Sequence, residues 1–217
     1  MVDIIYISWR KEVGSRRYLI ARIRRSARGL SFSYRQQQLE HAKKEGLEYI
    51  SGFQDVDKLK DEDVHRILAL RVIKKERSDS KQFLDFWEAS GTEDIFDLVS
   101  LTQGKSPTDN LEFLGVYHPK KGLKFVTDLA GLSHEKIEKD FLQEGDILTY
   151  RRERYNSYDR DAIAVFKGQT RVGYVKRIHT RPFCEAKEKK PLHLVVKAVE
   201  QNGFVKQVFV KVEFIKI

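Results

Sequence analysis

Rings and cations alternate along residues 151–177 of this 217-residue chain. Single nucleic-acid strands are held by aromatic side chains on which bases stack, at about 1–3 kcal/mol per base, and by cations that follow the phosphates. The interleaving of the two kinds of residue therefore favours a nucleic-acid-binding surface. Its members are Tyr155, Tyr158, Phe166 and Tyr174 among Arg151, Arg152, Arg154, Arg160, Arg171, Lys176 and Arg177.

A purely structural role explains the same residues equally well. Asn156 and Asp159 are typical turn formers, whose side chains accept hydrogen bonds from the nearby backbone. Tyr158 and Tyr174 would then pack against a hairpin, and Phe166 is the ring that we expect in the core. The residue types alone leave both interpretations open.

Sets of residues for catalysis or for metal binding are not visible. The six histidines are scattered, and none forms a zinc-binding spacing with Cys184. Cys184 and His179 could act as nucleophile and base, but a lone cysteine is more often a small buried residue. The segment 104–106 resembles the end of a phosphate-binding loop, yet Val99 stands where that loop needs its first glycine. We expect a protein that is not an enzyme and has neither metal nor cofactor.

The net charge of +9 indicates an anionic partner. Basic residues prevail at both ends of the chain, while acidic residues prevail in residues 36–110. A basic face attracts nucleic acid, acidic proteins and anionic membranes alike. The single cysteine excludes an intramolecular disulfide, and no apolar run approaches the roughly 20 residues of a membrane span. These features predict a cytoplasmic protein with no membrane contact.

The first half is predicted to form a small antiparallel sheet followed by helices. Strand-forming residues between turn signals indicate strands at residues 4–9, 17–24 and 30–34. Apolar residues at helical spacing indicate helices that begin at Gln36 and Asp61, and two more that are capped by Asp79 and Thr92.

Four arginines cluster on the second of these strands and on the turn that follows it: Arg22, Arg24, Arg25 and Arg28. As a solvated strand face they need no further explanation, and we favour that interpretation. The alternative is that they follow a phosphate backbone.

The second half is predicted to be mainly β. A linker at residues 107–110 indicates a domain boundary, which divides the chain into residues 1–108 and 109–217. Strands are expected at residues 111–117, 123–129, 147–151, 162–166, 170–175, 192–199 and 205–217, with short helices at 135–142 and from 178 towards 190. So many short strands with little helix predict a small barrel or curled sheet, and the whole chain is predicted to be α+β.

Three motifs in this half resemble the HIRAN domain. They are Gly145-Asp146-x-Leu148, Glu153-x-x-Asn156-x-Tyr158-Asp159-x-x-Ala162-Ile163-x-Val165, and Val172-Gly173-Tyr174-Val175-x-Arg177. The resemblance implies an OB-like β-barrel that holds the 3′ end of single-stranded DNA.

The resemblance also implies a role for each matching residue. Tyr158 would contact the terminal nucleotide, and Asp159 would accept a hydrogen bond from its 3′-hydroxyl. A carboxylate accepts from a hydroxyl but repels a 3′-phosphate. Asn156 and Tyr174 would complete the pocket. The cations expected at the DNA backbone are Arg151, Arg154, Arg160, Lys176 and Arg177, and weaker candidates near the DNA are Ser133 and His134.

Two positions depart from the family pattern. Ser157 stands where the family usually has proline, so the loop loses a fixed φ angle. Ser133 lies in a segment that often carries arginine, and a hydroxyl does not bind phosphate as a guanidinium does.

The first half, residues 1–108, resembles the amino-terminal subdomain of HipA-type toxins. Tyr6-Ile7-Ser8-Trp9, the segment 18–23 and Phe32-Ser33-Tyr34 carry this resemblance. A domain of this kind precedes HIRAN in a set of bacterial proteins, so the pairing implies a bacterial origin and no activity of its own.

Two functions from different classes remain. The first is a DNA-binding protein whose barrel holds single-stranded DNA or a DNA end, while the first half contacts a protein partner or the DNA flank. The second is a regulatory module of a toxin or defence system, whose basic barrel binds an acidic protein. A nuclease ranks below both for want of a catalytic set.

Overall fold

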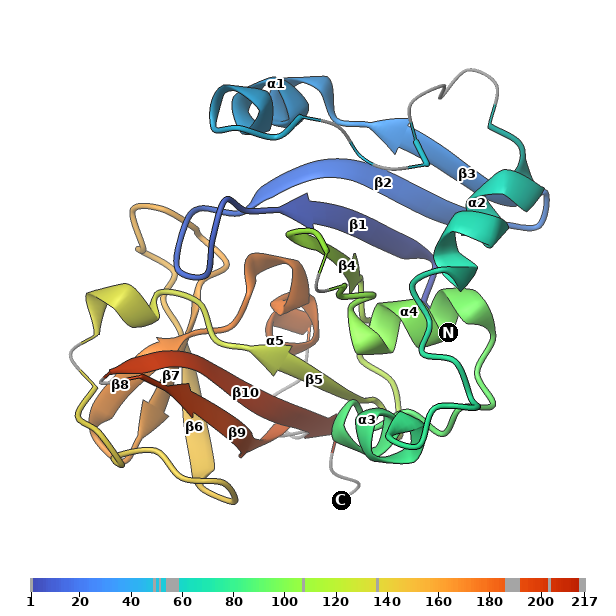
Figure 1. The fold of residues 1–217 in the computed structure, drawn as a ribbon. Helices are drawn as coiled ribbons and strands as arrows, with labels where there is room; N and C mark the ends of the chain where they lie inside the picture. The colour runs from blue at the N-terminus through green and yellow to red at the C-terminus, as the bar shows by residue number, and fades with distance from the viewer. Residues whose placement is uncertain are drawn as a thin grey trace. The chain divides into compact units, whose positions relative to one another are not determined.

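The computed structural model describes residues 2–48, 50, 52–53, 59–106, 108–135, 137–185, 192–202 and 204–214. The chain divides into two compact units, one that ends at Val116 and one that begins at Tyr117. Each unit is built on its own antiparallel sheet (Figure 1). The predicted α+β class is confirmed.

Unit 1 contains a four-stranded sheet with the order β3-β2-β1-β4. The predicted strands of the first half are present as β1 (Ile4–Trp9), β2 (Tyr18–Ser26) and β3 (Gly29–Tyr34). The fourth strand, β4 (Leu111–Gly115), pairs with β1 and aligns Phe113 with Ile7. The sequence boundary at residue 108 had assigned this segment to the second domain, whereas its hydrogen bonds join it to unit 1.

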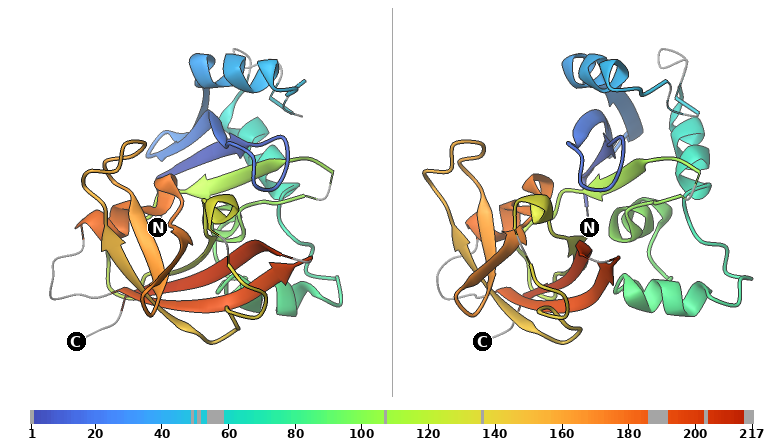
Figure 2. Two further views of the ribbon diagram at one scale, coloured as in Figure 1. Left: turned by 90° about the vertical axis from the view of Figure 1, so that its left-hand side faces the viewer. Right: turned by 60° about the vertical axis from the view of Figure 1, so that its left-hand side comes forward.

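Three helices of unit 1 pack against this sheet, α1 (Gln36–Lys44) on β2, α2 (Asp61–Ala69) on β3 and α4 (Ile95–Thr102) on β4. A fourth helix, α3 (Ser80–Phe86), lies between α2 and α4 in the sequence. The covered face buries Ile5, Ile7, Ile23 and Phe113, each fully excluded from solvent. Figure 2 shows α2 and α4 on the same side of the strands. Neither α2 nor α4 covers the opposite face of the sheet.

One predicted helix cap is wrong, and the second residue holds the N-cap position without the expected side-chain bond. Helix α4 is capped by Asp94, whose carboxylate accepts a hydrogen bond from the backbone of Asp97 at 2.8 Å, and not by Thr92. Asp79 precedes α3 but makes no side-chain cap bond, because its carboxylate pairs with Arg77 at 2.7 Å. A charged guanidinium is a stronger partner than a backbone amide.

Unit 2 is a six-stranded, curled half-barrel with the order β5-β10-β9-β6-β7-β8. Its inner face buries Phe125, Val208, Val210 and Val212 completely. The predicted strands are present as β5 (Lys124–Asp128), β6 (Ile147–Arg152), β7 (Ile163–Lys167), β8 (Thr170–Tyr174), β9 (Leu192–Gln201) and β10 (Val205–Phe214).

The short helices of unit 2 differ from the prediction. The helix expected at residues 135–142 is wrong, because the described residues of this segment form turns and bends, and a 3-10 helix, η2 (Leu132–His134), precedes them. The helix expected from residue 178 is present as η3 (Arg177–His179) and α5 (Arg181–Glu185). Its expected continuation over 186–190 lies outside the described residues.

The two edges of the half-barrel meet at one bridge. The amide of Ala130 donates to the carbonyl of Tyr174 at 2.7 Å, and the amide of Tyr174 returns the bond at 2.9 Å. Gly173 permits this approach, because it has a φ of 138° and an added Cβ would lie 2.9 Å from the carbonyl oxygen of Ala130. Only glycine fits this position without moving the backbone.

We expect Gly173→Ala to lower the free energy of unfolding by about 3 kcal/mol or more, because backbone strain and a clash with Ala130 add together. Gly168→Ala is the matched control, since Gly168 has a φ of 58° and an added Cβ would meet nothing within 4 Å. The control should lose only about 1–2 kcal/mol, the cost of the left-handed conformation. Denaturant unfolding of both variants measures the difference, and equal losses would contradict the close approach.

Candidate functional site

The loop between β6 and β7, residues 153–162, is held by its own backbone. Arg152 pairs with Ile163 at the end of the hairpin. The amide of Glu153 donates to the carbonyl of Ala162 at 2.9 Å, and the amide of Ala162 donates to the carbonyl of Asp159 at 3.1 Å. The base of the loop is therefore an extension of the hairpin.

Asn156 shapes the tip of this loop. Its Oδ1 accepts from the backbone amides of Tyr158 at 3.0 Å and Asp159 at 3.1 Å. Asp159 in turn accepts from the amide of Asp161 at 3.0 Å through its Oδ1. The side-chain-to-backbone bonds of the structural interpretation are present. They also fix the direction in which Tyr158 and Asp159 leave the backbone.

Glu153 connects the loop to β8. Its Oε2 accepts from Asn156 Nδ2 and from the hydroxyl of Tyr174, both at 3.1 Å. Its other oxygen lies 3.7 Å from a guanidinium nitrogen of Arg171. Sequence reasoning did not place Glu153 among the site residues, although its spacing of three from Asn156 within the second motif is the signal that could have found it.

Tyr174 is held on several sides. Burial raises the pKa of its phenol, and the hydrogen bond to Glu153 raises it further. The guanidinium of Arg171 lies 5.2 Å from the centre of the ring and donates to Glu135 at 2.7 Å. Tyr174 is therefore a fixed wall of the loop, and one face of its ring is already occupied by Arg171.

Tyr158, Asp159 and Arg177 form the open part of the site. Tyr158 is 95% exposed, and Tyr155 is equally open to solvent. Arg177 Nε lies 3.6 Å from Asp159 Oδ2, with side-chain exposures of 78% for the arginine and 19% for the aspartate. An exposed ring and a partly exposed carboxylate thus lie next to each other in the sequence of the loop, and an exposed cation lies beside the carboxylate.

The remaining predicted cations divide into exposed and buried ones. Arg151, Arg154 and Arg160 are exposed, and residues 151–156 line an open depression of about 430 Å³. Lys176 is only 3% exposed and forms an ion pair with the buried Asp128. A buried, paired ammonium is not available to a phosphate, so Lys176 has a structural role here.

Phe166 and Ser133 also differ in their surroundings. Phe166 was expected in the core, but it is half-buried, and the guanidinium of Arg151 lies 5.0 Å from its ring centre. The expectation is wrong because Phe166 pairs with the exposed Thr149 on the outer face of the sheet. Ser133 is exposed in η2, and of the neighbouring His134 only the backbone is described.

His179 and Cys184, the two residues considered for catalysis, lie in different surroundings. His179 is fully buried, with Nδ1 2.8 Å from Thr127 Oγ1 and its ring against Tyr117 and Phe125. Burial raises the pKa of the Cys184 thiol, which favours the unreactive protonated form. Within the described ranges, no group of three or more His, Cys, Asp or Glu residues could hold a metal ion. No helix in the same ranges is long and apolar enough to cross a membrane.

The bond between Tyr174 and Glu153 can be followed by titration. The raised pKa favours the neutral phenol in the folded protein, so this contribution to stability is complete below the ordinary tyrosine pKa of about 10 and is lost as the pH rises through the folded-state pKa. Ultraviolet absorbance of tyrosinate, taken as wild type minus Tyr174→Phe, should show one tyrosine that titrates above the usual range. Glu153→Gln should move that step to lower pH, and an unmoved step would contradict the bond.

Comparisons with known proteins concern this unit. Residues 123–197 match the family model of the HIRAN domain. Among solved structures, the HIRAN domain of human HLTF is similar at 17% identity and a TM-score of 0.33, over 42% of this chain and 75% of that one. A protein from Lactobacillus plantarum is similar at 20% identity and a TM-score of 0.34, over 43% of this chain and 95% of that one. No curated protein matches.

The matched segment runs from the start of β5 into β9 and includes the whole β6–β7 loop. It does not extend into unit 1. The resemblance of the first half to HipA-type toxins therefore stays a prediction.

Proposed function

We propose that the HIRAN domain at residues 123–197 binds single-stranded DNA through the β6–β7 loop and prefers an end with a free 3′-hydroxyl. One observation carries the proposal. Tyr158 and Asp159 stand next to each other on a loop whose backbone is fixed by Asn156, with an open ring and a reachable carboxylate beside Arg177. This is the arrangement that the family resemblance implies for those residues.

Tyr158 supplies the stacking surface. An exposed ring on a fixed turn loses little conformational freedom when a base packs against it, so most of the stacking energy contributes to affinity. A free tyrosine side chain also reaches its partner without displacing a protein neighbour. The terminal base is the natural occupant, because nothing follows it that would prevent the approach of Tyr158.

Asp159 supplies the preference for the hydroxyl. Its Oδ1 is engaged by the backbone of Asp161, while Oδ2 lies 3.6 Å from Arg177, longer than a good hydrogen bond. Oδ2 can therefore accept from a 3′-hydroxyl. A 3′-phosphate would bring negative charge against the carboxylate and be repelled.

Exposed cations around the loop supply the contacts to the DNA backbone. They are Arg151, Arg154, Arg160 and Arg177, and Lys176 is left out because it is buried. Such contacts are independent of sequence and weaken with salt. The proposed activity is binding alone, with no reaction, metal or cofactor.

We expect the wild type to bind a 3′-hydroxyl oligonucleotide about 10- to 100-fold more tightly than its 3′-phosphate counterpart, the value of one hydrogen bond to a charged group. Asp159→Ala should abolish this preference and keep weak, salt-sensitive binding. Asp161→Ala is the control, because it removes an equally acidic neighbour that pairs with Arg152 at the surface. Fluorescence anisotropy at two salt concentrations measures all three proteins.

Two outcomes of that titration would count against the proposal. An unchanged preference in Asp159→Ala would refute the pocket. Negligible binding of every oligonucleotide by the wild type would refute DNA binding and favour an acidic protein as the partner of the domain.

Tyr158→Ala should weaken binding of the 3′-hydroxyl oligonucleotide by about 5- to 100-fold, the contribution of one stacked base. Tyr155→Ala is the matched control, since the two rings are almost equally exposed and lie three residues apart. The control should bind nearly as well as the wild type. Equal losses in the two variants would show that Tyr158 has no special place at the DNA end.

A further inference from the structure

The sheet of unit 1 has one face that the proposed function does not use. Side chains alternate along a strand, so the residues between the buried Ile5, Ile7 and Ile23 point away from the helices. Strand register aligns these residues in two rows, one of Tyr6, Arg22 and Ser33 and one of Ile4, Arg24 and Ser31. The first row ends on β4 at Leu114, which is buried, so the accessible part of this face lies on β2 and β3. Arg35 extends the first row, because its guanidinium lies 5.5 Å from the ring centre of Tyr6. We call Tyr6, Arg22, Arg24, Ser31, Ser33 and Arg35 the arginine face.

The two faces of this sheet differ in whether their arginines form ion pairs with carboxylates. On the helix face, Arg25 forms ion pairs with Asp94 at 2.6 Å and Asp97 at 2.8 Å. On the arginine face, no carboxylate of the described residues lies within 4.0 Å of the guanidinium groups of Arg22, Arg24 or Arg35. Three like charges gathered without counterions repel one another, and an anionic ligand would relieve that repulsion.

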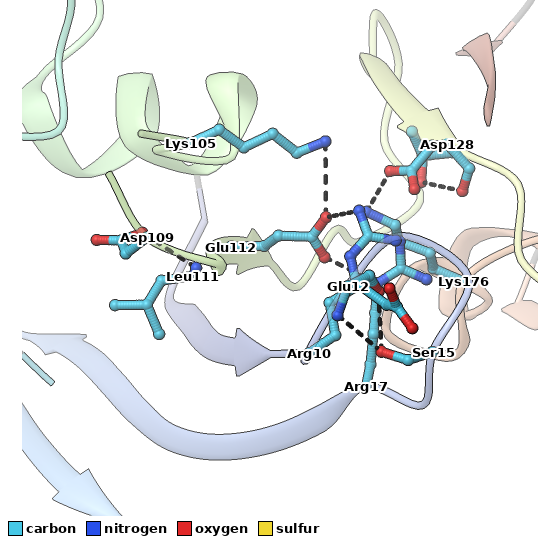
Figure 3. Close-up of polar contacts among 11 residues, drawn as sticks. Arg10, Glu12, Ser15, Arg17, Lys105, Asp109, Leu111, Glu112, Asp128 and Lys176 are labelled. Atoms are coloured by element: carbon cyan, nitrogen blue, oxygen red, sulfur yellow. Dashed lines mark hydrogen bonds and ion pairs between the residues drawn. The ribbon is translucent and has the colours of Figure 1, made fainter. Parts of the chain in front are cut away.

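The nearest carboxylate along β4 is already engaged. Glu112 pairs in register with Ser8 of β1 and has a side chain that is almost fully buried. Figure 3 shows it turned towards Arg10, Arg17 and Lys105, at 3.1, 2.8 and 3.6 Å. Its charge is therefore shared among other cations and does not neutralise the arginine face.

The spacing and chemistry of the face suit a phosphodiester backbone. Arg22 and Arg24 are two residues apart on one strand, which separates them by about 6.7 Å, close to the distance between successive phosphates of a nucleic-acid strand. The hydroxyls of Ser31 and Ser33 can donate to phosphate oxygens. Tyr6 adds a half-buried ring, the kind of surface on which a base stacks.

The same face does not suit a membrane surface. Membrane-surface elements combine cations with exposed large apolar side chains that enter the lipid. In unit 1, the exposed large hydrophobic residues among those described are Val13 and Leu70, and neither belongs to the arginine face. The arginine face offers charge and hydroxyl donors instead.

We propose that the arginine face is a second nucleic-acid-binding surface, which holds the phosphate backbone of a single strand without need of an end. This inference stands on the residues of unit 1 and not on the 3′-end pocket. It assigns to the cluster of Arg22 and Arg24 the phosphate-following role that the sequence alone did not favour.

The test uses the full chain and a short circular single-stranded DNA, which has no 3′ end. The triple variant Arg22→Gln/Arg24→Gln/Arg35→Gln should bind the circle at least about tenfold more weakly at low salt. The slope of log K against log salt concentration should fall by about 2, since each phosphate contact on a single strand contributes about 0.7. Arg16→Gln/Arg66→Gln/Arg77→Gln removes the same net charge from exposed positions of unit 1 and should change little.

Each result decides the proposal. Equal losses in the two triple variants would overturn it in favour of net charge alone. It would also be overturned if the first variant kept its affinity for the circle but lost affinity for anionic phospholipid vesicles or for polyglutamate. The preference of the wild type for a 3′-hydroxyl over a 3′-phosphate end, measured with linear oligonucleotides, reports separately whether the 3′-end pocket fails.

A second measurement uses the wild type and does not depend on how the variants fold. Photocrosslinking with a circle that contains 5-iodouracil should attach to the peptide that contains Tyr6. Adducts confined to residues 123–197 would overturn the proposal.

Discussion

Tyr174 links the curvature of the second sheet to the shape of the candidate loop. Its backbone forms the bridge to Ala130 that brings the edges of the half-barrel together, and Gly173 permits the approach. Its phenol donates to Glu153, which also accepts from Asn156. Asn156 then fixes the backbone of Tyr158 and Asp159. The direction of the two proposed ligand-binding side chains therefore depends on the closure of the sheet behind them.

Charge around the loop is distributed in a way that suits the end of a strand better than its middle. Exposed arginines attract phosphates from any part of a nucleic acid. A carboxylate in their midst disfavours a phosphate at one point only, where Asp159 lies beside Arg177. Lys176 precedes Arg177 in the sequence but is buried in an ion pair with Asp128, so it stabilises the fold. Neighbouring cations of one motif can therefore have different roles. The proposed affinity for DNA and the proposed preference for its end would thus have separate physical sources in the same few residues.

Local sequence patterns predicted most strands but not their partners. Strand-forming residues between turn signals revealed β1 and β2, and alternation of apolar residues revealed β3 and β10. The pairing of β4 with β1 joins segments about a hundred residues apart, and no local pattern encodes that contact. The linker signal at residues 107–110 consequently placed the boundary before β4 instead of after it.

The sequence predicted which residue types lie on the candidate loop, and it did not predict the contacts between them. The motif identified Asn156, Tyr158 and Asp159, since turn formers and rings have recognisable spacing. The burial of Lys176, the outward position of Phe166 and the central place of Glu153 all depend on which face of a strand meets which neighbour. Those relations arise only when β6, β7 and β8 have paired.

The claim that the β6–β7 loop is the DNA-binding site is tested most directly by nuclear magnetic resonance of the full chain. Backbone amide shifts are recorded as a short 3′-hydroxyl oligonucleotide is added. We predict that the largest changes in residues 117–217 fall within residues 153–162 and 174–177. The account would be contradicted if the largest shift changes in residues 117–217 fell outside these two segments. It would also be contradicted if residues 117–217 showed no shift changes at saturating oligonucleotide.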